Sequence, residues 1–363
     1  MEKYVISGIQ QIGVGVEDLV TAWKYYIDLF NMDVKILDDN NIADIMAPYM
    51  GGKPRKKRAV IAVNMQGGGG FEIWQHQEHK PTKVAFDLHF GDLGIYAAKI
   101  KSRNVKQTYN EFIQNPKVEV LGEVKQSING ADTFFIKDIF GNIFQIVEDK
   151  YIFHDENRST GGPVGAIMGC TDIDRTMVIY RDILGYDQVV ADKTGVFEDI
   201  SSLNSGGQKY RRVLLTHSQP RKGSFSHLLG QSYIELVQAL ERKPKKIYDG
   251  RYWGDPGFIQ ICFDVRNMKA LEEKCANMGF PFTVDSSSKY KNGESFNMGE
   301  AAGQFTYIED PDGTLIEFVE THKIPIMKKL GLYLNLKKRD AEKPLQDWLL
   351  KMLRFGRVKP ENL

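Results

Sequence analysis

The sequence predicts an α+β fold made of four β-α-β-β-β modules in two pairs, followed by a helical C-terminal tail. A strand-turn-strand phrase occurs twice, at Phe134–Val147 and at Phe305–Val319. A helix-starting phrase also occurs twice, at Asp18–Tyr26 and Asp172–Tyr180, each running from an aspartate to a tyrosine. Such self-similarity indicates repeated supersecondary units. The length of 363 residues exceeds one ordinary core and favours two domains.

The composition is that of a globular protein with no dominant charge. The 48 basic and 47 acidic residues nearly cancel, so we expect neither nucleic acid nor a membrane as partner. No apolar run approaches membrane-spanning length, and the start lacks the apolar region of a secretory signal. Three cysteines without a Cys-x-x-Cys pair fit reduced thiols, which predicts a cytoplasmic location.

The modules are expected in chain order. In the first, Asp18 is a candidate N-cap for a helix over 19–30, whose apolar residues recur at helical spacing. Its strands are expected at 9–16, 34–37, 59–63 and 70–75. The second module is expected to have a strand at 84–90, a helix at 92–104, and strands near 118–124, 134–136 and 143–148. The third starts at residue 164 and ends with a strand at 232–238, and the fourth has a strand at 258–265, a helix at 268–278 and the final hairpin.

These elements predict three segments of the chain. Residues 149–162 are polar and aperiodic, which is typical of a linker. We therefore expect one domain at 1–150, a second at 160–323 and a tail at 324–363. Helical spacing at 345–353 predicts a helix in the tail, packed on its own domain or in a dimer contact.

The last hairpin contains a glutamate in an unusual setting. Asp310-Pro-Asp-Gly313 is a tight-turn sequence, and Leu315, Glu317 and Val319 share one face of the strand that follows. An ionised carboxylate among apolar neighbours needs a partner, either an arginine or a metal ion. In the earlier copy of the hairpin, Gln145 takes the place of Glu317.

A His-x-x-His pair, His76 and His79, ends the first module. Residues three apart on a strand point to opposite faces, so a shared metal would need a helical or looped backbone. We expect these histidines at the surface or at the edge of a cleft. Trp74 and His76 share the face of Glu72, so they are candidates to line the first cleft.

These paired modules resemble the vicinal oxygen chelate superfamily, also called the glyoxalase/bleomycin-resistance/dioxygenase fold. The resemblance covers residues 8 to about 321 and rests on Ile9–Leu19, Tyr233–Val237, and Asp310–Glu317 with its counterpart at 138–145. In that superfamily two modules curl into a half-barrel whose concave face holds one divalent metal. The resemblance thus implies two vicinal-oxygen-chelate half-barrel domains, each with ligands from the first and last strands of its modules.

The resemblance also implies two ligand sets. The first contains Gln11, Glu72, Lys83 and Gln145, and the second contains Gly165, Glu235, Gln260 and Glu317. Gln11 and Glu72 are acceptable ligands, but a protonated Lys83 repels a cation, so we expect no metal in the first site. Glu235, Gln260 and Glu317 offer oxygen donors, which suit magnesium, manganese or calcium. If a metal is bound there, we expect magnesium, manganese or nickel in preference to iron. Alternatively, the two carboxylates share a proton without metal.

Two functions follow from the resemblance. The first is a lyase or isomerase of glyoxalase or epimerase type acting on a small oxygenated metabolite. Glu317 and Glu235 would bind metal or exchange a proton. Gln260, Gln11, Trp74 and Tyr307 would contact the substrate, and segments 38–58 and 285–300 would wall the cleft.

The alternative is a non-catalytic small-molecule binding protein of the bleomycin-resistance type. A ferrous extradiol-type dioxygenase is disfavoured, because two of its three iron-ligand positions read Gly165 and Gln260. We expect a small-molecule ligand and a monomer or homodimer.

Overall fold

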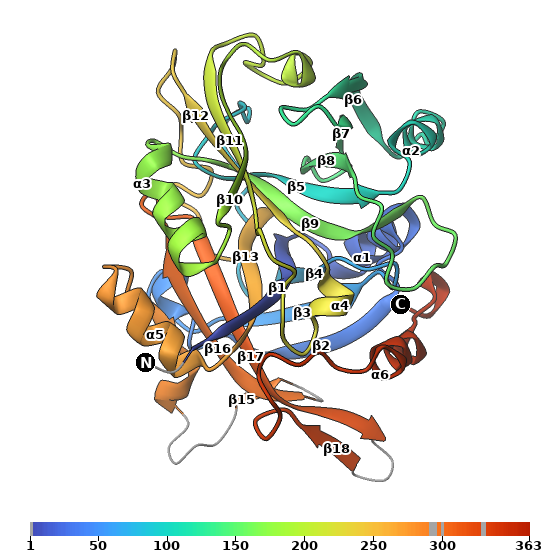
Figure 1. Cartoon of the computed structure of the whole chain (residues 1–363), viewed down its shortest axis with the longest axis vertical. Coiled ribbons are helices and arrows are strands. Elements are labelled where there is room, and N and C mark those ends of the chain that lie inside the picture. Colours follow the sequence, from blue (N-terminus) through green and yellow to red (C-terminus); the bar gives the residue numbers. More distant parts are fainter. Residues whose placement is uncertain (1–2, 290–295, 299–300, 328–331) are drawn as a thin grey trace.

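A computed structural model describes residues 3–289, 296–298, 301–327 and 332–363. Within these ranges ten strands form one sheet, called sheet A, in the lower part of Figure 1. Its main strand order is β14-β16-β17-β13-β1-β4-β3-β2, with β15 paired to β16 and β18 to β17. The strands of sheet A are β1 (Val5–Gly15), β2 (Val34–Ile42), β3 (Lys56–Val63), β4 (Gly70–His76), β13 (Gly257–Arg266), β14 (Val284–Asp285), β15 (Phe296–Met298), β16 (Ala301–Glu309), β17 (Leu315–Met327) and β18 (Leu332–Asn335).

Eight strands of the described chain form the other sheet, called sheet B, in the order β10-β11-β12-β9-β5-β8-β7-β6. It occupies the upper part of Figure 1. Its strands are β5 (Gly94–Ser102), β6 (Glu119–Gln126), β7 (Asp132–Lys137), β8 (Ile143–Glu148), β9 (Thr160–Gly169), β10 (Gln188–Gly195), β11 (Tyr210–Thr216) and β12 (Tyr233–Ala239). The helices are α1 (Leu19–Phe30), α2 (Val105–Phe112), α3 (Ile173–Val178), α4 (Ser226–Leu229), α5 (Met268–Asn277) and α6 (Asp347–Lys351), with short helical turns η1 (Ala47–Met50), η2 (Ile179–Ile183), η3 (Glu198–Ile200), η4 (Ser286–Lys289), η7 (Met352–Gly356) and η8 (Pro360–Asn362).

The four expected modules are present, but they pair differently from their order in the chain. Strand β1 pairs antiparallel with β13, which joins the first module to the fourth in sheet A. Strand β5 pairs antiparallel with β9, which joins the second module to the third in sheet B. The segments 1–150 and 160–323 are therefore not the two half-barrels, because each sheet takes one module from each segment.

Alternation along the central strands separates a core face from a concave face. Ile12 and Val14 of β1 lie in the main hydrophobic core, so Gln11 and Gly13 point the other way. The core includes side chains from both sheets and from helices α1, α2 and α5. Phe144 of β8 and Phe258 of β13 meet there, with ring centroids 5.3 Å apart. One continuous core thus joins the two sheets, and the side chains on their concave faces point away from it.

Several local predictions are confirmed. Helix α1 spans the expected residues, and Asp18 Oδ1 accepts a hydrogen bond of 2.7 Å from the Thr21 backbone nitrogen. In the final hairpin, Asp310 Oδ1 accepts bonds from the backbone of Asp312 and Thr314, and Gly313 has a φ of 92°. This left-handed backbone conformation explains why a glycine occupies position 313.

The start of the second module was predicted wrongly. No strand occurs at 84–90 among the described residues, and 94–102 is strand β5 where a helix was expected. Alanine and lysine in Ala97-Ala-Lys-Ile-Lys101 favour a helix on propensity. Register shifts between Ile95 and Ala97 and between Lys99 and Ile100 also break the two-residue alternation. Pairing with β8 and β9 overrides the local preference.

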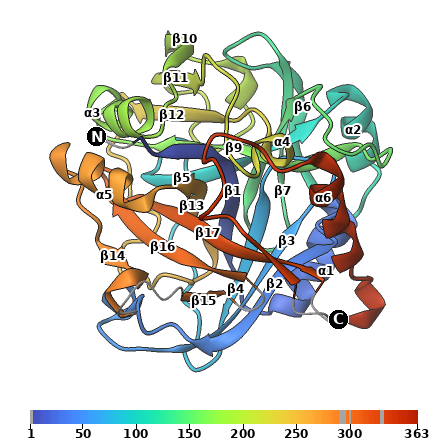
Figure 2. The ribbon, with the colours of Figure 1, turned by 60° about the horizontal axis from the view of Figure 1, so that its bottom comes forward.

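The tail is only partly helical. Its first residues extend β17 to Met327, and the predicted helix is shortened to α6 and the turn η7. Leu345 and Leu350 are buried in a small core with Val34, Met65 and Leu228, so the tail packs on its own chain beside β2 (Figure 2).

Among the described residues, no helix is long and apolar enough to cross a membrane. Cys170, Cys262 and Cys275 all lie in described segments and are buried free thiols.

The module pairing predicts the behaviour of fragments. Residues 1–155 and 156–363, expressed separately, should each fail to unfold cooperatively, because each lacks half of both sheets. Mixed together, they should restore one cooperative thermal transition, followed by circular dichroism. Full-length protein cleaved within 149–159 is the control for the chain break. Cooperative unfolding of either isolated fragment would contradict this pairing.

Candidate functional site

The concave face of sheet A gathers four polar side chains from its four central strands. In spatial order they are Glu317 of β17, Gln260 of β13, Gln11 of β1 and Glu72 of β4. Each flanks residues that lie in the main core, so alternation turns all four to the opposite face. We call this group the Glu72/Glu317 cleft.

Gln260 connects the two carboxylates of the cleft. Its Nε2 donates to Glu72 Oε2 at 2.7 Å and lies 3.4 Å from Glu317 Oε2. Gln11 Nε2 reaches Glu72 Oε2 at 3.5 Å. Gly13 leaves room for this arrangement, because a Cβ there would lie 2.5 Å from the Gln260 side chain. The carboxylates therefore share an amide donor in place of an arginine.

A cavity of about 90 Å³ is lined by three of these side chains, Gln11, Glu72 and Glu317. Glu72 is partly exposed in it, whereas Gln11, Gln260 and Glu317 are buried. Part of segment 38–58 lines the cavity, as expected, while residues 290–295 and 299–300 of the other expected wall lie outside the described residues. The aromatic wall consists of Trp74, Trp253, Phe305 and Tyr307.

Burial raises the pKa values of both carboxylates, and repulsion between them raises that of Glu317 further. Desolvation, reinforced by the charge of Glu72, raises the pKa of Glu317 from 4.5 to about 8. Desolvation also raises the pKa of Glu72, while the charge of Lys57 opposes that shift. Lys57 itself forms an ion pair with Asp39 at the cavity wall. At neutral pH the pair thus retains a proton on Glu317.

Two amide oxygens in this cleft have no hydrogen-bond partner among the described residues. They are Oε1 of Gln11 and Oε1 of Gln260, and both are buried. Buried polar atoms normally have partners, so unpaired ones point to a missing ligand. Together with Glu72 and Glu317, they form an all-oxygen donor set that fits a hard divalent cation.

The concave face of sheet B contains a different arrangement, which we call the Lys99 cleft. Lys99 Nζ lies 2.6 Å from Glu235 Oε2 and also bonds Gln145. Arg212 reaches Glu235 Oε1 at 2.7 Å and Asp199 at 2.6 Å. These charged side chains are almost fully buried. Although burial alone raises the pKa of Glu235, Arg212 and Lys99 hold that pKa at about 2.

The structure regroups the predicted site residues. Glu235 was expected beside Glu317, but it lies in the other sheet with Gln145 and Gly165. Lys83 was expected at a ligand position, but its ammonium group is exposed and pairs with Glu17 at 2.7 Å. Glu72 and Gln11 join Gln260 and Glu317, and Trp74 and Tyr307 line the same cavity. The lysine that fills a cleft is Lys99, which was missed because its strand was predicted as a helix.

The His76 and His79 pair also differs from expectation. His76 is buried at the end of β4, and the chain bends after it, so that His79 returns towards it with ring centroids 4.9 Å apart. Burial lowers the pKa of His76 to about 4, which keeps its imidazole neutral at pH 7. Both rings face Asp255 from the loop before β13.

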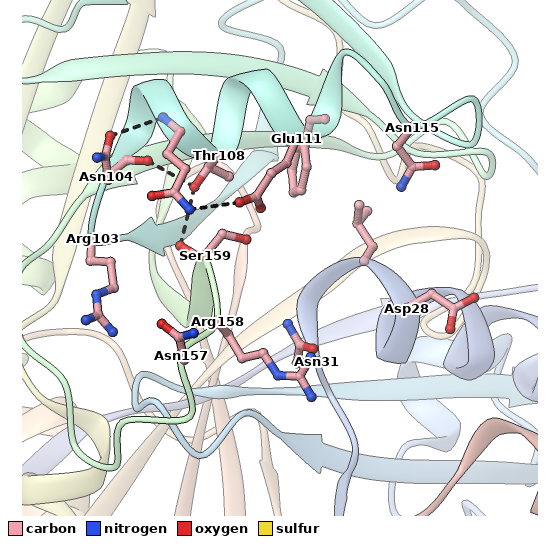
Figure 3. A pocket seen from close by; sticks show the side chains of 13 residues that line it. Asp28, Asn31, Arg103, Asn104, Thr108, Glu111, Asn115, Asn157, Arg158 and Ser159 are labelled. Carbon is pink, nitrogen blue, oxygen red and sulfur yellow. Dashed lines mark hydrogen bonds between the residues drawn. The ribbon is translucent and has the colours of Figure 1, made fainter.

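A larger pocket of about 580 Å³ lies away from both concave faces (Figure 3). It lies between the end of α1, helix α2 and the segment at 157–159. Its lining is polar and mixed in charge, with Arg103, Arg158, Asp28 and Glu111. Glu111 bonds Gln107 at 3.1 Å, Arg103 pairs with Asp155 and Asp28 pairs with Lys117, so three of these four charged side chains already have partners.

The comparisons agree with this fold. Residues 166–297 match the family model described as the Glyoxalase/Bleomycin resistance protein/Dioxygenase superfamily. Glyoxalase I from Zea mays is 12% identical, with a TM-score of 0.52 and 98% of each chain covered. A putative dioxygenase from Bacillus subtilis subsp. subtilis strain 168 is 12% identical, with a TM-score of 0.53, covering 98% of this chain and 97% of that one. No curated protein matches the chain significantly. The family-model match is thus confined to residues 166–297, while the chain as a whole shares the fold of these solved structures, with two curled sheets.

The Lys99 cleft predicts a large loss of stability when its charges are unbalanced. Glu235→Gln or Lys99→Met should each lower the free energy of unfolding by about 3–5 kcal/mol, because each leaves one buried charge in excess in a cluster whose two cations and two carboxylates otherwise balance. The double variant should lose less than the sum of the two, measured by urea unfolding. Lys83→Met, at the exposed pair, should change stability by less than about 1 kcal/mol. Additive losses in the double variant would exclude a coupled pair.

The Glu72/Glu317 cleft predicts an unusual pH dependence in chelator-treated protein. Because the pKa of folded Glu317 is about 8, the unfolded chain releases this proton earlier, and stability falls as pH rises from 4.5 towards 8. Glu317→Gln should therefore be more stable than wild type at pH 8 by on the order of 1–3 kcal/mol, with little difference at pH 5. Glu17→Gln, on an exposed carboxylate, should show no such trend. An equal effect of Glu317→Gln at both pH values would contradict a raised pKa.

Proposed function

We propose that the protein is an enzyme of the lyase or isomerase type that transfers a proton on a small oxygenated metabolite in the Glu72/Glu317 cleft. The observation that carries this proposal is a pair of carboxylates bridged by the Gln260 amide beside an aromatic-walled cavity. Carboxylates whose pKa values are shifted by burial and by each other are suited to acid–base chemistry near neutral pH.

The two carboxylates differ in a way that suggests their roles. Glu72 is partly exposed to the cavity and lies near Lys57, so it is the ionised member and accepts a proton from a carbon next to a carbonyl. Glu317 holds its proton at neutral pH and donates it to the carbonyl oxygen, which receives the electron pair of the broken carbon–hydrogen bond. Gln260 positions both groups. Glu72 thus replaces Glu235 as the proposed partner of Glu317.

A divalent metal fits this cleft as the alternative to a proton on Glu317, because a carboxylate that binds a metal must be deprotonated. The unpaired oxygens of Gln11 and Gln260 and the carboxylates of Glu72 and Glu317 would hold it. A bound ion would polarise the adjacent oxygen atoms of the substrate. The four donors are oxygens, which suit magnesium or manganese, and the lack of an imidazole disfavours iron. For the same reason an iron-dependent dioxygenase is the less favoured reaction.

The second candidate function is non-catalytic binding of a small molecule. The Lys99 cleft favours it, because there the chain's own cation neutralises the carboxylate and leaves no free base. The size of the Glu72/Glu317 cavity argues against a large ligand. About 90 Å³ is well below the roughly 300–1,000 Å³ of pockets for drug-sized molecules.

We propose a small molecule as the physiological ligand and the cytoplasm as the location. The three buried free thiols are compatible with a reducing compartment. Packing of the tail on its own chain leaves a monomer or a homodimer as the proposed states.

The proposal predicts that activity depends on both carboxylates. Wild-type protein should exchange the carbon-bound proton of small α-hydroxycarbonyl compounds with solvent deuterium, followed by NMR. Glu317→Gln and Glu72→Gln should each lower the exchange rate by about 10²–10⁴-fold. Metal purified with the protein, or restored with Mg²⁺, Mn²⁺ or Ni²⁺, should also be lost in both variants.

Glu17→Gln is the matched control, since it removes an exposed carboxylate that pairs only with Lys83 among the described residues. It should keep full exchange and metal content. If the glutamate variants bind the same compounds and are stabilised by them as wild type is, and neither wild type nor the variants show exchange, the result supports the binding function and contradicts the enzymatic one.

A further inference from the structure

A second group of metal-ligating side chains lies outside the Glu72/Glu317 cleft. It consists of His76 at the end of β4, His79 in the bend that follows, and Asp255 in the loop before β13. One ligand atom from each residue lies within 4.8 Å of the others. The group joins the first module to the fourth at the rim of sheet A, behind Trp74 of the cavity wall, whose ring lies 4.5 Å from that of His76.

The imidazole nitrogens of this group are buried but lack ordinary hydrogen bonds. The His76 side chain is 0% exposed, and although the Trp253 backbone lies near its ring, neither ring nitrogen makes a hydrogen bond of good geometry in the described part of the chain. The same holds for Nε2 of His79. A buried imidazole normally satisfies at least one nitrogen, since an unpaired buried polar group costs about 1–3 kcal/mol.

Asp255 supplies the negative charge. Its carboxylate is fully buried, and in the described part of the chain the basic side chains within 4.0 Å of it are the two imidazoles. Oδ1 accepts a hydrogen bond from the Thr82 backbone at 3.0 Å, and Oδ2 accepts one from the Tyr252 backbone at 2.8 Å. Such outer hydrogen bonds orient a ligating carboxylate in metal sites. A buried carboxylate without a lysine or arginine partner is suited to a cation.

We propose that His76, His79 and Asp255 bind a divalent transition-metal ion, with zinc as the best match. Two imidazole nitrogens and one carboxylate oxygen suit zinc better than magnesium or calcium. Tetrahedral zinc holds such atoms about 3.4 Å apart. His79 Nε2 lies 3.4 Å from Asp255 Oδ1, and His76 Nε2 lies 4.0 Å from it, so a small side-chain movement completes the set.

The ion would tie the end of β4 to the loop before β13. His79 is about 20% exposed, so water has access from its side and can fill the remaining coordination position. Arg55 opposes binding, because its guanidinium lies 4.8 Å from the centre of the Tyr252 ring, which packs against His79. The three ligands must therefore outweigh one nearby cation.

The test separates this site from the Glu72/Glu317 cleft. Full-length Glu72→Gln/Glu317→Gln protein, stripped with chelator, is titrated with Zn²⁺ by calorimetry and with Co²⁺ by visible absorption. We expect one equivalent of each metal, a Co²⁺ spectrum with imidazole ligands, and a metal-dependent rise in melting temperature.

His79→Ala in the same background should raise the Kd by more than about 100-fold, since loss of an outer-shell partner alone costs about 10–100-fold. His227→Ala is the matched control, because His227 pairs with Asp347 at 2.7 Å on the surface, and it should bind as the parent does. The comparison is also made in the wild-type background, where His79→Ala should remove one equivalent. Binding unaffected by His79→Ala, or no binding in the parent proteins, would overturn the proposal.

Discussion

The antiparallel pairing of β1 with β13 is the contact on which the candidate site depends. It places Gln11 and Gln260 on neighbouring strands, and the parallel neighbours of these strands bring Glu72 and Glu317 to either side. Adjacent strands are about 4.8 Å apart, so only a continuous sheet through this seam allows four side chains to converge. The same seam brings Asp255 to His76. Both proposed metal-binding groups are therefore products of one strand pairing between distant parts of the chain.

The two concave faces show how one fold supports opposite outcomes. In sheet B, Lys99 and Arg212 neutralise Glu235 within the chain, so that the buried carboxylate has two cationic partners. In sheet A the carboxylates meet amide groups and each other, so burial raises their pKa values and leaves two amide oxygens unpaired. An unsatisfied polar group lowers stability unless it serves binding or chemistry. This contrast, more than the presence of glutamates, distinguishes the candidate site from its structural twin.

Local patterns were reliable where burial and backbone preference agree. The spacing of Leu19, Trp23, Tyr26 and Phe30 predicted α1 because one side of that helix is buried. The prediction for strand β5 was wrong because its residues favour a helix and its β-bulges interrupt the two-residue alternation of side chains. The His76 and His79 spacing was judged on a straight strand, whereas β4 ends at His76 and the chain bends. That bend has no clear sequence signal, since Gln77 and Glu78 are compatible with many conformations.

The sequence by itself determined the module type, the hairpin turn at Asp310–Gly313 and the inward direction of Glu317 and Glu72. These features follow from short-range sterics and two-residue alternation, which act within a few residues. Only the tertiary structure decided that Glu317 meets Glu72 instead of Glu235, and that Lys99 fills the other cleft. Strand edges offer nearly the same backbone hydrogen bonds to any partner, so the choice between modules comes from packing of the shared core, which no local pattern records.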